Sequence, residues 1–453
     1  MEKLLLRIEG YLWGWPLLLL LLGSGLLLMI RLRFVPLLSL PRAMRLVFRR
    51  KKQAPGQISP FAALCTALSA AVGTGNIVGV ASALSLGGPG ALLWMELSAF
   101  IGLALRYAEG WLSIRYRLRR PDGTHWGGPF VYIRQGLGAS WTPLAKLFSF
   151  FCAAAGICGA GSFVQMGSVS SCLRELLHRG DLPFLPQGTD RSLWITWIIA
   201  VFSMLCAGAA GWVIFRGMRG VSRVSSVLVP VMGLLYALCC LWILVRQREA
   251  LPAAIRSVLQ GAFEPSALHG GLLGTAMAGI SRGLFSNEAG LGTAPIASAA
   301  AEGVSPEEQG LISMTAIVFD TFFLCTLTGL VLLVTGTASC GIGAAMQAFS
   351  IGLPFPRPVS EWLVFVILSL FAFTTIVGWS CFSSSCLDDL SGGNPRWRTL
   401  YLSAYLGTVL AAPWCSAQGI WVSANIWNAL MAIPNLLALC LLSGKIRTGK
   451  RAS

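Results

Sequence analysis

The sequence predicts an all-α membrane protein with about eleven transmembrane helices. Two observations carry this prediction, the composition of the chain and the spacing of its apolar blocks. Of its 453 residues, 55% are hydrophobic and only 11% are charged, and the mean hydropathy is +0.71. A soluble domain carries about 25% charged residues. So few charges cannot cover a surface in water, but they suit a surface that meets lipid.

The apolar residues fall into blocks near the length of roughly 20 residues that a helix needs to cross the hydrocarbon core. The eleven predicted spans are Leu12–Ile30, Ile58–Leu86, Ala91–Ile114, Leu147–Leu173, Ser192–Trp212, Val224–Val245, Ala267–Ala301, Leu311–Val334, Trp362–Cys381, Thr399–Pro413 and Ile420–Leu442. The first span is too long for the apolar core of a signal peptide, and no small-residue cleavage site follows it. We therefore expect a retained helix there.

The basic residues are distributed unevenly between the predicted loops. If the C-terminus is cytoplasmic, 22 of the 34 Lys and Arg residues lie in cytoplasmic segments, as the positive-inside rule requires. With eleven spans the N-terminus then lies outside. We expect a multi-pass protein of a bacterial plasma (inner) membrane. The net charge of +16 alone would suggest nucleic acid, but charge gathered in the loops of one side indicates a lipid bilayer instead.

Two of the predicted spans are interrupted by glycines and polar residues at their centres. The second span has its break at Gly73–Asn76, and the seventh has its break at Ser286–Gly292. Glycine lowers helix stability by about 1 kcal/mol against alanine. Unwound backbone at membrane depth is tolerated only when it is buried in protein or lines a cavity. Small residues also let helices pack closely, but packing does not require Thr74, Asn76 or Ser286.

The spacing of the two breaks predicts an internal repeat. They lie five spans apart, so the two helices cross the membrane in opposite directions, which is typical of transporters with inverted five-helix repeats. One extra helix then precedes the repeats. The predicted division is 1–57 for the extra helix and a basic cytoplasmic segment, 58–245 for the first repeat, 246–444 for the second, and 445–453 for a basic cytoplasmic tail.

Buried ionisable residues accompany the second break. Glu288 lies near the centre of its span, where a charge usually faces a cavity or a partner. Arg282 is a candidate partner, and an ion pair between them is the alternative to direct binding by Glu288. We expect Asp320 to stabilise the broken helix by accepting its freed backbone N–H groups, and Arg106 to pair with Glu109.

The breaks themselves indicate what they bind. Freed N–H groups at the N-terminus of a half-helix bind a carboxylate, and freed carbonyls coordinate Na⁺. An amino acid zwitterion and a sodium ion fit such a pair of breaks. Thr374 and Thr375 add two hydroxyls in an apolar helix. Their alternative role is to bond back to the preceding turn.

The thirteen cysteines contain no C-x-x-C pair and mostly lie within predicted helices, so we interpret them as small packing residues. Cys340 and Cys415 fall in predicted outside loops, and a disulfide between them stays an alternative. The chain carries no H-E-x-x-H, P-loop or G-x-S-x-G motif, and we do not expect an enzyme.

Several motifs resemble those of the alanine/glycine:cation symporter family (sodium:alanine symporters), in the same order and over nearly the whole chain. They are Gly73–Leu84, Gly87–Gly90, Gly127–Tyr132, Arg282–Ile296, Gln309–Gly310, Asp320–Thr321, Gly378–Ser380 and Asn428–Leu436. The resemblance implies a LeuT-type fold of the amino acid-polyamine-cation superfamily, with substrate held between the two broken helices.

By the same resemblance, site residues are carried over by position. The implied substrate-binding residues are Gly73, Thr74, Gly75, Asn76, Gln165, Phe285, Ser286, Asn287 and Trp379. The implied sodium site uses carbonyls of Ser69 and Val72 with the hydroxyls of Thr374 and Thr375. The leading hypothesis is import of alanine or glycine coupled to Na⁺. The alternatives are proton coupling with Glu288 titrating, and an amino-acid sensor or channel on the same fold.

Overall fold

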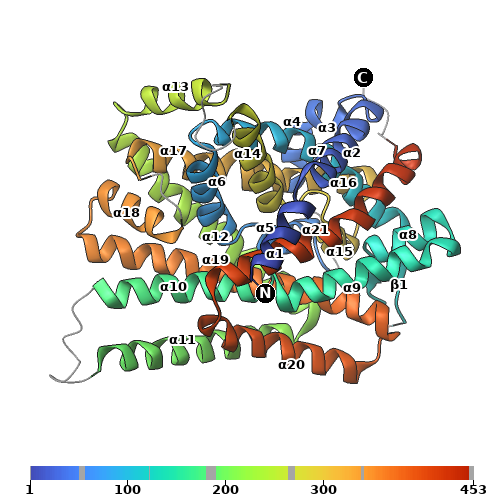
Figure 1. Cartoon of the computed structure of the whole chain (residues 1–453). Coiled ribbons are helices and arrows are strands. Elements are labelled where there is room, and N and C mark those ends of the chain that lie inside the picture. The colour runs from blue at the N-terminus through green and yellow to red at the C-terminus, as the bar shows by residue number, and fades with distance from the viewer. Residues whose placement is uncertain are drawn as a thin grey trace.

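Helices form nearly all of the structure, a computed structural model that describes residues 2–49, 57–121, 123–179, 190–263, 271–337 and 341–447 (Figure 1). Each predicted span overlaps one helix or two consecutive ones. They are α2 (Trp15–Arg31), α5 and α6 (Pro60–Ala71, Val80–Gly87), α7 (Ala91–Tyr116), α9 and α10 (Thr142–Cys158, Phe163–Arg179), α11 (Arg191–Ile214), α12 (Gly217–Arg246), α14 and α15 (Gly271–Asn287, Ala294–Ala299), α16 and α17 (Pro306–Ile317, Thr326–Val334), α19 (Arg357–Ser391), α20 (Pro395–Ala411) and α21 (Ala417–Leu442).

The length and hydropathy of the helices in the structure identify fewer membrane spans than the eleven predicted from the sequence. Within the described ranges, eight helical stretches are long and apolar enough to cross a membrane, and nine if α5 and α6, which are bent by 53°, count as one. The helix α14 and the helix α20 have only 17 residues each. The all-α membrane architecture is therefore confirmed, while the count of eleven stays a prediction.

Shorter elements connect and cover these helices. They are α1 (Glu2–Leu12), α3 (Val35–Leu38), α4 (Leu40–Val47), α8 (Pro129–Leu137), α13 (Leu251–Gly261), α18 (Ile342–Gly352), a hairpin of β1 (Leu118–Arg119) and β2 (His125–Trp126), and 3₁₀ turns at Ala139–Trp141, Ala412–Trp414 and Ser443–Lys445. These helices were not among the predicted spans, because each has at most 11 residues, which is too few to cross a membrane.

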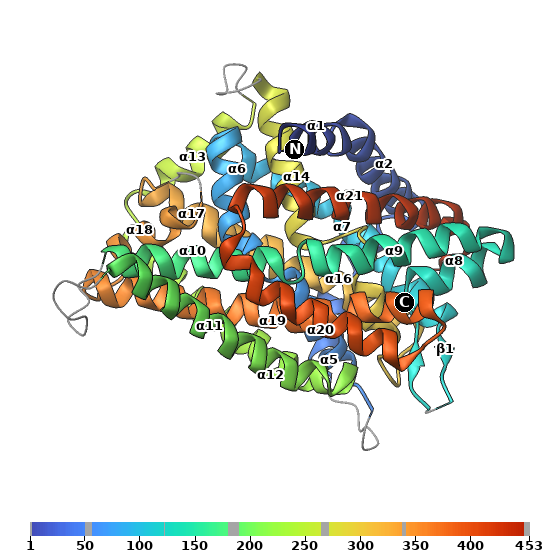
Figure 2. The ribbon, with the colours of Figure 1, turned by 60° about the horizontal axis from the view of Figure 1, so that its bottom comes forward.

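The two broken helices lie against each other in opposite directions. The first half of one, α5, packs on the second half of the other, α15, while α6 packs on α14. Figures 1 and 2 show α6 beside α14. At the far end, the Glu302 N–H donates to the Ile58 carbonyl at 3.0 Å, which joins the start of α5 to the segment after α15. Such crossed halves are what two antiparallel helices produce, as the predicted inversion requires.

Close approach at glycines packs α7 against the broken helix α14 and against α16. A Cβ added to Gly279 of α14 would lie 2.2 Å from the Ala91 carbonyl oxygen of α7. A Cβ added to Gly110 of α7 would lie 2.4 Å from the Ser313 hydroxyl of α16. Small residues let helices approach in this way in membranes, where apolar burial between helices gives little driving force.

Large apolar side chains cover the outer face of the helices at one edge of the molecule. On α11 and α12, Leu205, Trp212 and Val245 are each more than 60% exposed, and Figure 1 shows α11 and α20 forming the lower edge of the molecule. Apolar surface of this extent suits lipid contact, so the protein is a multi-pass membrane protein.

The proposed division of the chain into domains stays a prediction, and a disulfide between Cys340 and Cys415 stays an alternative. Cys340 lies outside the described residues, and Cys415 is exposed.

Candidate functional site

The first break comprises three residues between α5 and a π-helical turn, η1 (Gly75–Gly79), which continues into α6. The helix α5 ends before Val72, whose ψ of 89° is not helical. Gln165 of α10 then fastens the unwound backbone. Its Oε1 accepts bonds from the backbone N–H of Thr74 at 3.2 Å and from the Thr74 hydroxyl at 3.1 Å. The Gly73 N–H donates to Asn76 Oδ1 at 3.1 Å. The structure thus brings the predicted residues Gly73, Thr74, Asn76 and Gln165 together.

A buried carboxylate joins the two breaks. Asp320 is fully buried in a second π-helical segment, η3 (Val318–Cys325), between α16 and α17. Its Oδ1 accepts from Asn76 Nδ2 at 2.6 Å. Its Oδ2 accepts from the hydroxyls of Ser286 at 3.2 Å and Thr321 at 2.9 Å. One donor therefore comes from each broken helix.

This arrangement corrects the expected role of Asp320. We expected it to accept backbone N–H groups of the broken seventh span, but it accepts side-chain donors. The reason is that α14 continues as helix to Asn287, so Ser286 still has helical backbone and offers only its hydroxyl to Asp320. The π-helical turns at both Asn76 and Asp320 were not predicted, because a shift in hydrogen-bond register leaves no signature in composition. Such turns are frequent at functional sites.

The second break runs from Glu288 to Thr293, slightly later than predicted. Glu288 has a left-handed backbone, with φ of 51°, as do Gly290 and Gly292. For a residue other than glycine this conformation is uncommon and marks functional or strained positions. The Glu288 carboxylate accepts from the Thr293 hydroxyl at 2.6 Å and from Trp379 Nε1 at 3.1 Å. It thus bonds neutral donors rather than the candidate partner Arg282, which lines a separate pocket.

A polar cluster at Arg106, Glu109 and Asn435 holds the unwound segment. Arg106 donates to the Asn287 carbonyl at 2.5 Å and lies 3.8 Å from Glu109, so the predicted ion pair is present and fully buried. Glu109 accepts from the Gly292 N–H at 3.1 Å and from Asn435 Nδ2 at 2.8 Å. Asn435 lies in one of the motifs that resemble the symporter family, but no role was predicted for it. An amide in a largely apolar helix was the feature of the sequence that could have indicated one.

The remaining predicted substrate residues are placed in different ways. A Cβ on Gly75 would lie 3.9 Å from the Phe285 ring, so these two face each other across the breaks. Asn287 is buried, and its Nδ2 has no hydrogen-bond partner among the described residues. Trp379 is fully buried and its indole N–H is already bonded to Glu288, so it supports the second break. Trp421, which was not predicted, packs on Phe285 with ring centroids 5.7 Å apart.

The four predicted sodium ligands are only partly brought together. The Thr375 hydroxyl lies 3.5 Å from the Val72 carbonyl oxygen, and Ser69 lies one turn earlier on α5, packed on Gly378. The Thr374 hydroxyl instead lies 3.3 Å from the Met232 sulfur, on another side of α19. Both hydroxyls also bond back to the Phe371 carbonyl, as the alternative interpretation expected.

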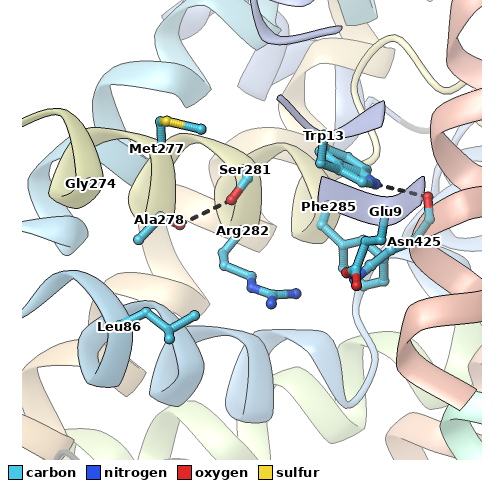
Figure 3. Close-up of a pocket in the computed structure, with 10 residues that line it drawn as sticks. All are labelled: Glu9, Trp13, Leu86, Gly274, Met277, Ala278, Ser281, Arg282, Phe285 and Asn425. Carbon is cyan, nitrogen blue, oxygen red and sulfur yellow. Dashed lines mark hydrogen bonds between the residues drawn. The ribbon is translucent and has the colours of Figure 1, made fainter. Parts of the chain in front are cut away.

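Cavities lie on either side of the joined breaks. One of about 260 Å³ is lined by Phe285, Arg282 and Glu9 (Figure 3). Another of about 550 Å³ is lined by Arg120, Asp388 and other polar residues near the β hairpin. Between them the breaks are closed by the contacts described above. A closed polar centre flanked by two openings is the geometry of a carrier.

Comparison with known proteins agrees with this geometry. The profile of the sodium:alanine symporter family matches residues 1–451, and the chain belongs to this family. The chain is 38% identical to the sodium/alanine symporter AgcS of Methanococcus maripaludis over 98% of this chain and 95% of that protein. It is 41% identical to an uncharacterized transporter of Haemophilus influenzae over 97% of this chain and 93% of the relative.

A solved structure shares the fold. The crystal structure of MhsT in complex with L-phenylalanine superposes with a TM-score of 0.60, at 14% sequence identity, over 89% of this chain and 94% of that one. The fold is therefore LeuT-type, as the resemblance implied, and the protein is a transporter of the amino acid:cation symporter class.

Proposed function

We propose that this protein imports a small neutral amino acid, alanine or glycine, together with Na⁺. The observation that carries the proposal is the Asp320 carboxylate, which bonds Asn76 of the first break and Ser286 beside the second. It ties the two broken helices at one buried point. A ligand that binds between the breaks then acts on both halves of the fold at once.

The substrate site of the proposal comprises Gly73, Thr74, Gly75, Asn76, Gln165, Phe285, Ser286 and Asn287. The π-helical turn η1 begins at Gly75, and the positive end of its backbone dipole there favours a carboxylate. Asn287 supports this assignment because its buried Nδ2 is available as a donor. Trp379 acts through Glu288 rather than by lining the site, since its indole N–H is bonded to that carboxylate.

The small size of the substrate follows from Gly75 and Phe285. A Cβ built on Gly75 would already be in van der Waals contact with the Phe285 ring, at 3.9 Å. Little space for a substrate side chain therefore lies between them while Phe285 packs on Trp421. Alanine and glycine need the least.

The sodium ion of the proposal is bound where the first break meets α19. The Val72 carbonyl and the Thr375 hydroxyl lie together there, and both are the oxygen ligands that a hard cation takes. The carbonyl of Ser69 completes the set one turn earlier. Thr374 stays in the proposal only as a packing residue, because its hydroxyl lies against Met232.

Coupling follows from the shared backbone of the two sites. Val72 precedes Gly73 and Thr74 directly, so an ion that fixes the Val72 carbonyl also fixes the unwound residues that meet the substrate. An ion and a substrate that each prefer the same arrangement shift the population toward it together.

We further propose that the N-terminus lies outside and the C-terminus in the cytoplasm of a bacterial inner membrane, on the basis of the positive charge of the loops.

Proton coupling is the second candidate. It is favoured by Glu288, an ionisable group only 4% exposed whose two described partners are neutral donors. A proton on Glu288 would remove the buried charge that Thr293 and Trp379 now satisfy. In that case transport follows the proton gradient and not the sodium gradient.

The test is uptake of radiolabelled alanine and glycine into proteoliposomes under an inward sodium gradient. We expect uptake that saturates and stops when choline replaces Na⁺. Uptake that needs no Na⁺ but collapses with a protonophore would favour the proton alternative. Flux without saturation would indicate a channel, and binding without flux would indicate a sensor.

A further inference from the structure

A second pocket, separate from the joined breaks, lies between α1, α6, α14 and α21 (Figure 3). It has a volume of about 260 Å³. Its polar lining residues include Glu9 of α1, Arg282 of α14 and Asn425 of α21. Glu9 and Arg282 are half-buried. Figure 3 shows the guanidinium of Arg282 and the carboxylate of Glu9 extending into the same space from different helices.

The charges of this pocket are held in place by α21. Asn425 is 5% exposed, and its side-chain amide donates to the Glu9 carboxylate. Its backbone carbonyl accepts from the indole N–H of Trp13 at 2.8 Å. The carboxylate of Glu9 is therefore oriented by Asn425. One residue of α21 thus fixes both the acid and the aromatic side chain that the N-terminal segment contributes.

A single aromatic residue, Phe285, separates the pocket from the first break. Phe285 lines the pocket, packs on Trp421, and lies in contact distance of a Cβ at Gly75. Rotation of the Phe285 ring would therefore connect the pocket to the unwound backbone. A ligand in this pocket lies one aromatic ring away from the proposed substrate site.

We propose that this pocket is an outer binding site for the zwitterion of an amino acid. Arg282 receives the carboxylate and Glu9 receives the ammonium group, while Phe285 separates the ligand from the breaks. The N-terminal helix α1 is thereby part of the binding apparatus, although it precedes the repeats. The identity of the ligand rests on the proposed function, but the existence of the site does not depend on transport.

The experiment uses the purified full-length protein in detergent with a Met277→Cys substitution. Met277 lines the pocket and is half-buried, so a hydrophilic maleimide reaches a thiol placed there. Modification of position 277 is followed by peptide mass spectrometry with and without L-alanine. At ten times its dissociation constant, alanine should slow the modification about elevenfold, because only the unliganded fraction reacts.

The same measurement is repeated with Gly73→Ala added, which impairs the site between the breaks. Protection of position 277 by alanine should persist in this background. It should disappear when Glu9→Gln or Arg282→Gln is added, because each removes one charge that the zwitterion needs. Ser281→Ala is the matched control, since Ser281 lines the pocket without a charge and its hydroxyl bonds the Ala278 carbonyl. It should keep the protection.

Ligand chemistry gives a second readout. Alaninamide lacks the carboxylate and propionate lacks the ammonium group, so neither should protect position 277. The exposed native Cys415 is the internal reference for the reactivity of the maleimide, because its rate of modification should not respond to alanine. Loss of protection when Gly73→Ala is present, or protection that survives both charge removals, would overturn the outer site. Failure of sodium-driven uptake in the wild type would instead overturn the proposed function and leave this result standing.

Discussion

At the scale of single residues, the polar side chains of the breaks form a set of hydrogen bonds around the unwound backbone. Asn76 bonds Asp320, Asp320 bonds Ser286, and Gln165 bonds Thr74. Buried polar groups are costly when they lack partners, so this set fixes the conformation of the unwound backbone. Substitutions within it should alter transport more than stability.

Gly73→Ala should impair transport because the position has no room for a methyl group. The added Cβ would lie 2.7 Å from the Thr375 hydroxyl and 3.1 Å from Gln165 Oε1. We expect sodium-driven alanine uptake to fall at least about tenfold, the equivalent of roughly 1.4 kcal/mol. Gly79→Ala is the control on the same broken helix, because nothing lies within 4 Å of its added Cβ. Equal loss in both variants would show that any change on this helix impairs transport.

Thr375→Ala and Thr374→Ala should separate the two adjacent hydroxyls. Only Thr375 reaches the Val72 carbonyl, so its loss should raise the sodium concentration for half-maximal uptake at least about fivefold. One polar contact is worth roughly 1 kcal/mol. Thr374→Ala should leave that concentration nearly unchanged. The reverse order of effects would place the ion on the other side of α19.

The sequence predicted which residues gather here better than what each one does. Asn76, Ser286 and Asp320 stood out as polar residues in apolar spans, and the structure joins them. The bond from Trp379 to Glu288 was not predictable, because it depends on how α19 lies against an unwound segment. The left-handed backbone of Glu288 was not predicted either. Asn287 and Glu288 are both polar residues just before the glycines, so composition does not show at which of them the helix ends.

At the scale of elements, each break is supported by a neighbouring helix. The segment after α14 is held by Arg106 and Glu109 of α7 and by Asn435 of α21. The sequence predicted both breaks and their opposite directions from glycines and spacing. It did not predict the π-helical turns, or that α1 covers a pocket, because neither hydrogen-bond register nor the docking of a short helix follows from apolar periodicity.

Arg106→Met should destabilise the protein strongly by leaving Glu109 without its buried partner. Breaking a buried ion pair on one side costs roughly 3–5 kcal/mol. We expect a lower midpoint for unfolding by SDS in mixed micelles. Adding Glu109→Gln should restore part of the loss, because the double variant buries no unpaired charge. A double variant less stable than Arg106→Met would contradict this account of the cluster.

At the scale of the whole molecule, the LeuT-type arrangement places two crossed, broken helices at the centre and apolar faces at the periphery. Composition and charge predicted a membrane protein, because every residue that faces lipid must be compatible with it and so contributes to the composition. The assignment of sides rests on charge alone, so it calls for a direct test.

Single cysteines, each introduced into a variant in which the thirteen native cysteines are replaced by serine, should report the sides of the membrane. Arg248→Cys, after α12, should react with an impermeant maleimide in intact cells. Arg219→Cys, at the start of α12, should react only after permeabilisation. Both positions are exposed in the structure, so accessibility within the fold does not differ between them. The opposite labelling pattern would reverse the topology and place the C-terminus outside.

The central claim is that the two breaks together bind an amino acid and a sodium ion. The most direct test is equilibrium binding of radiolabelled alanine, in Na⁺ and in choline, to the purified protein with Glu9→Gln, which removes the proposed outer site. We predict saturable binding that requires Na⁺, that weakens at least about tenfold in Gly73→Ala, and that is unchanged in Gly79→Ala. Alanine binding of equal strength with and without Na⁺, and in both glycine variants, would contradict the account.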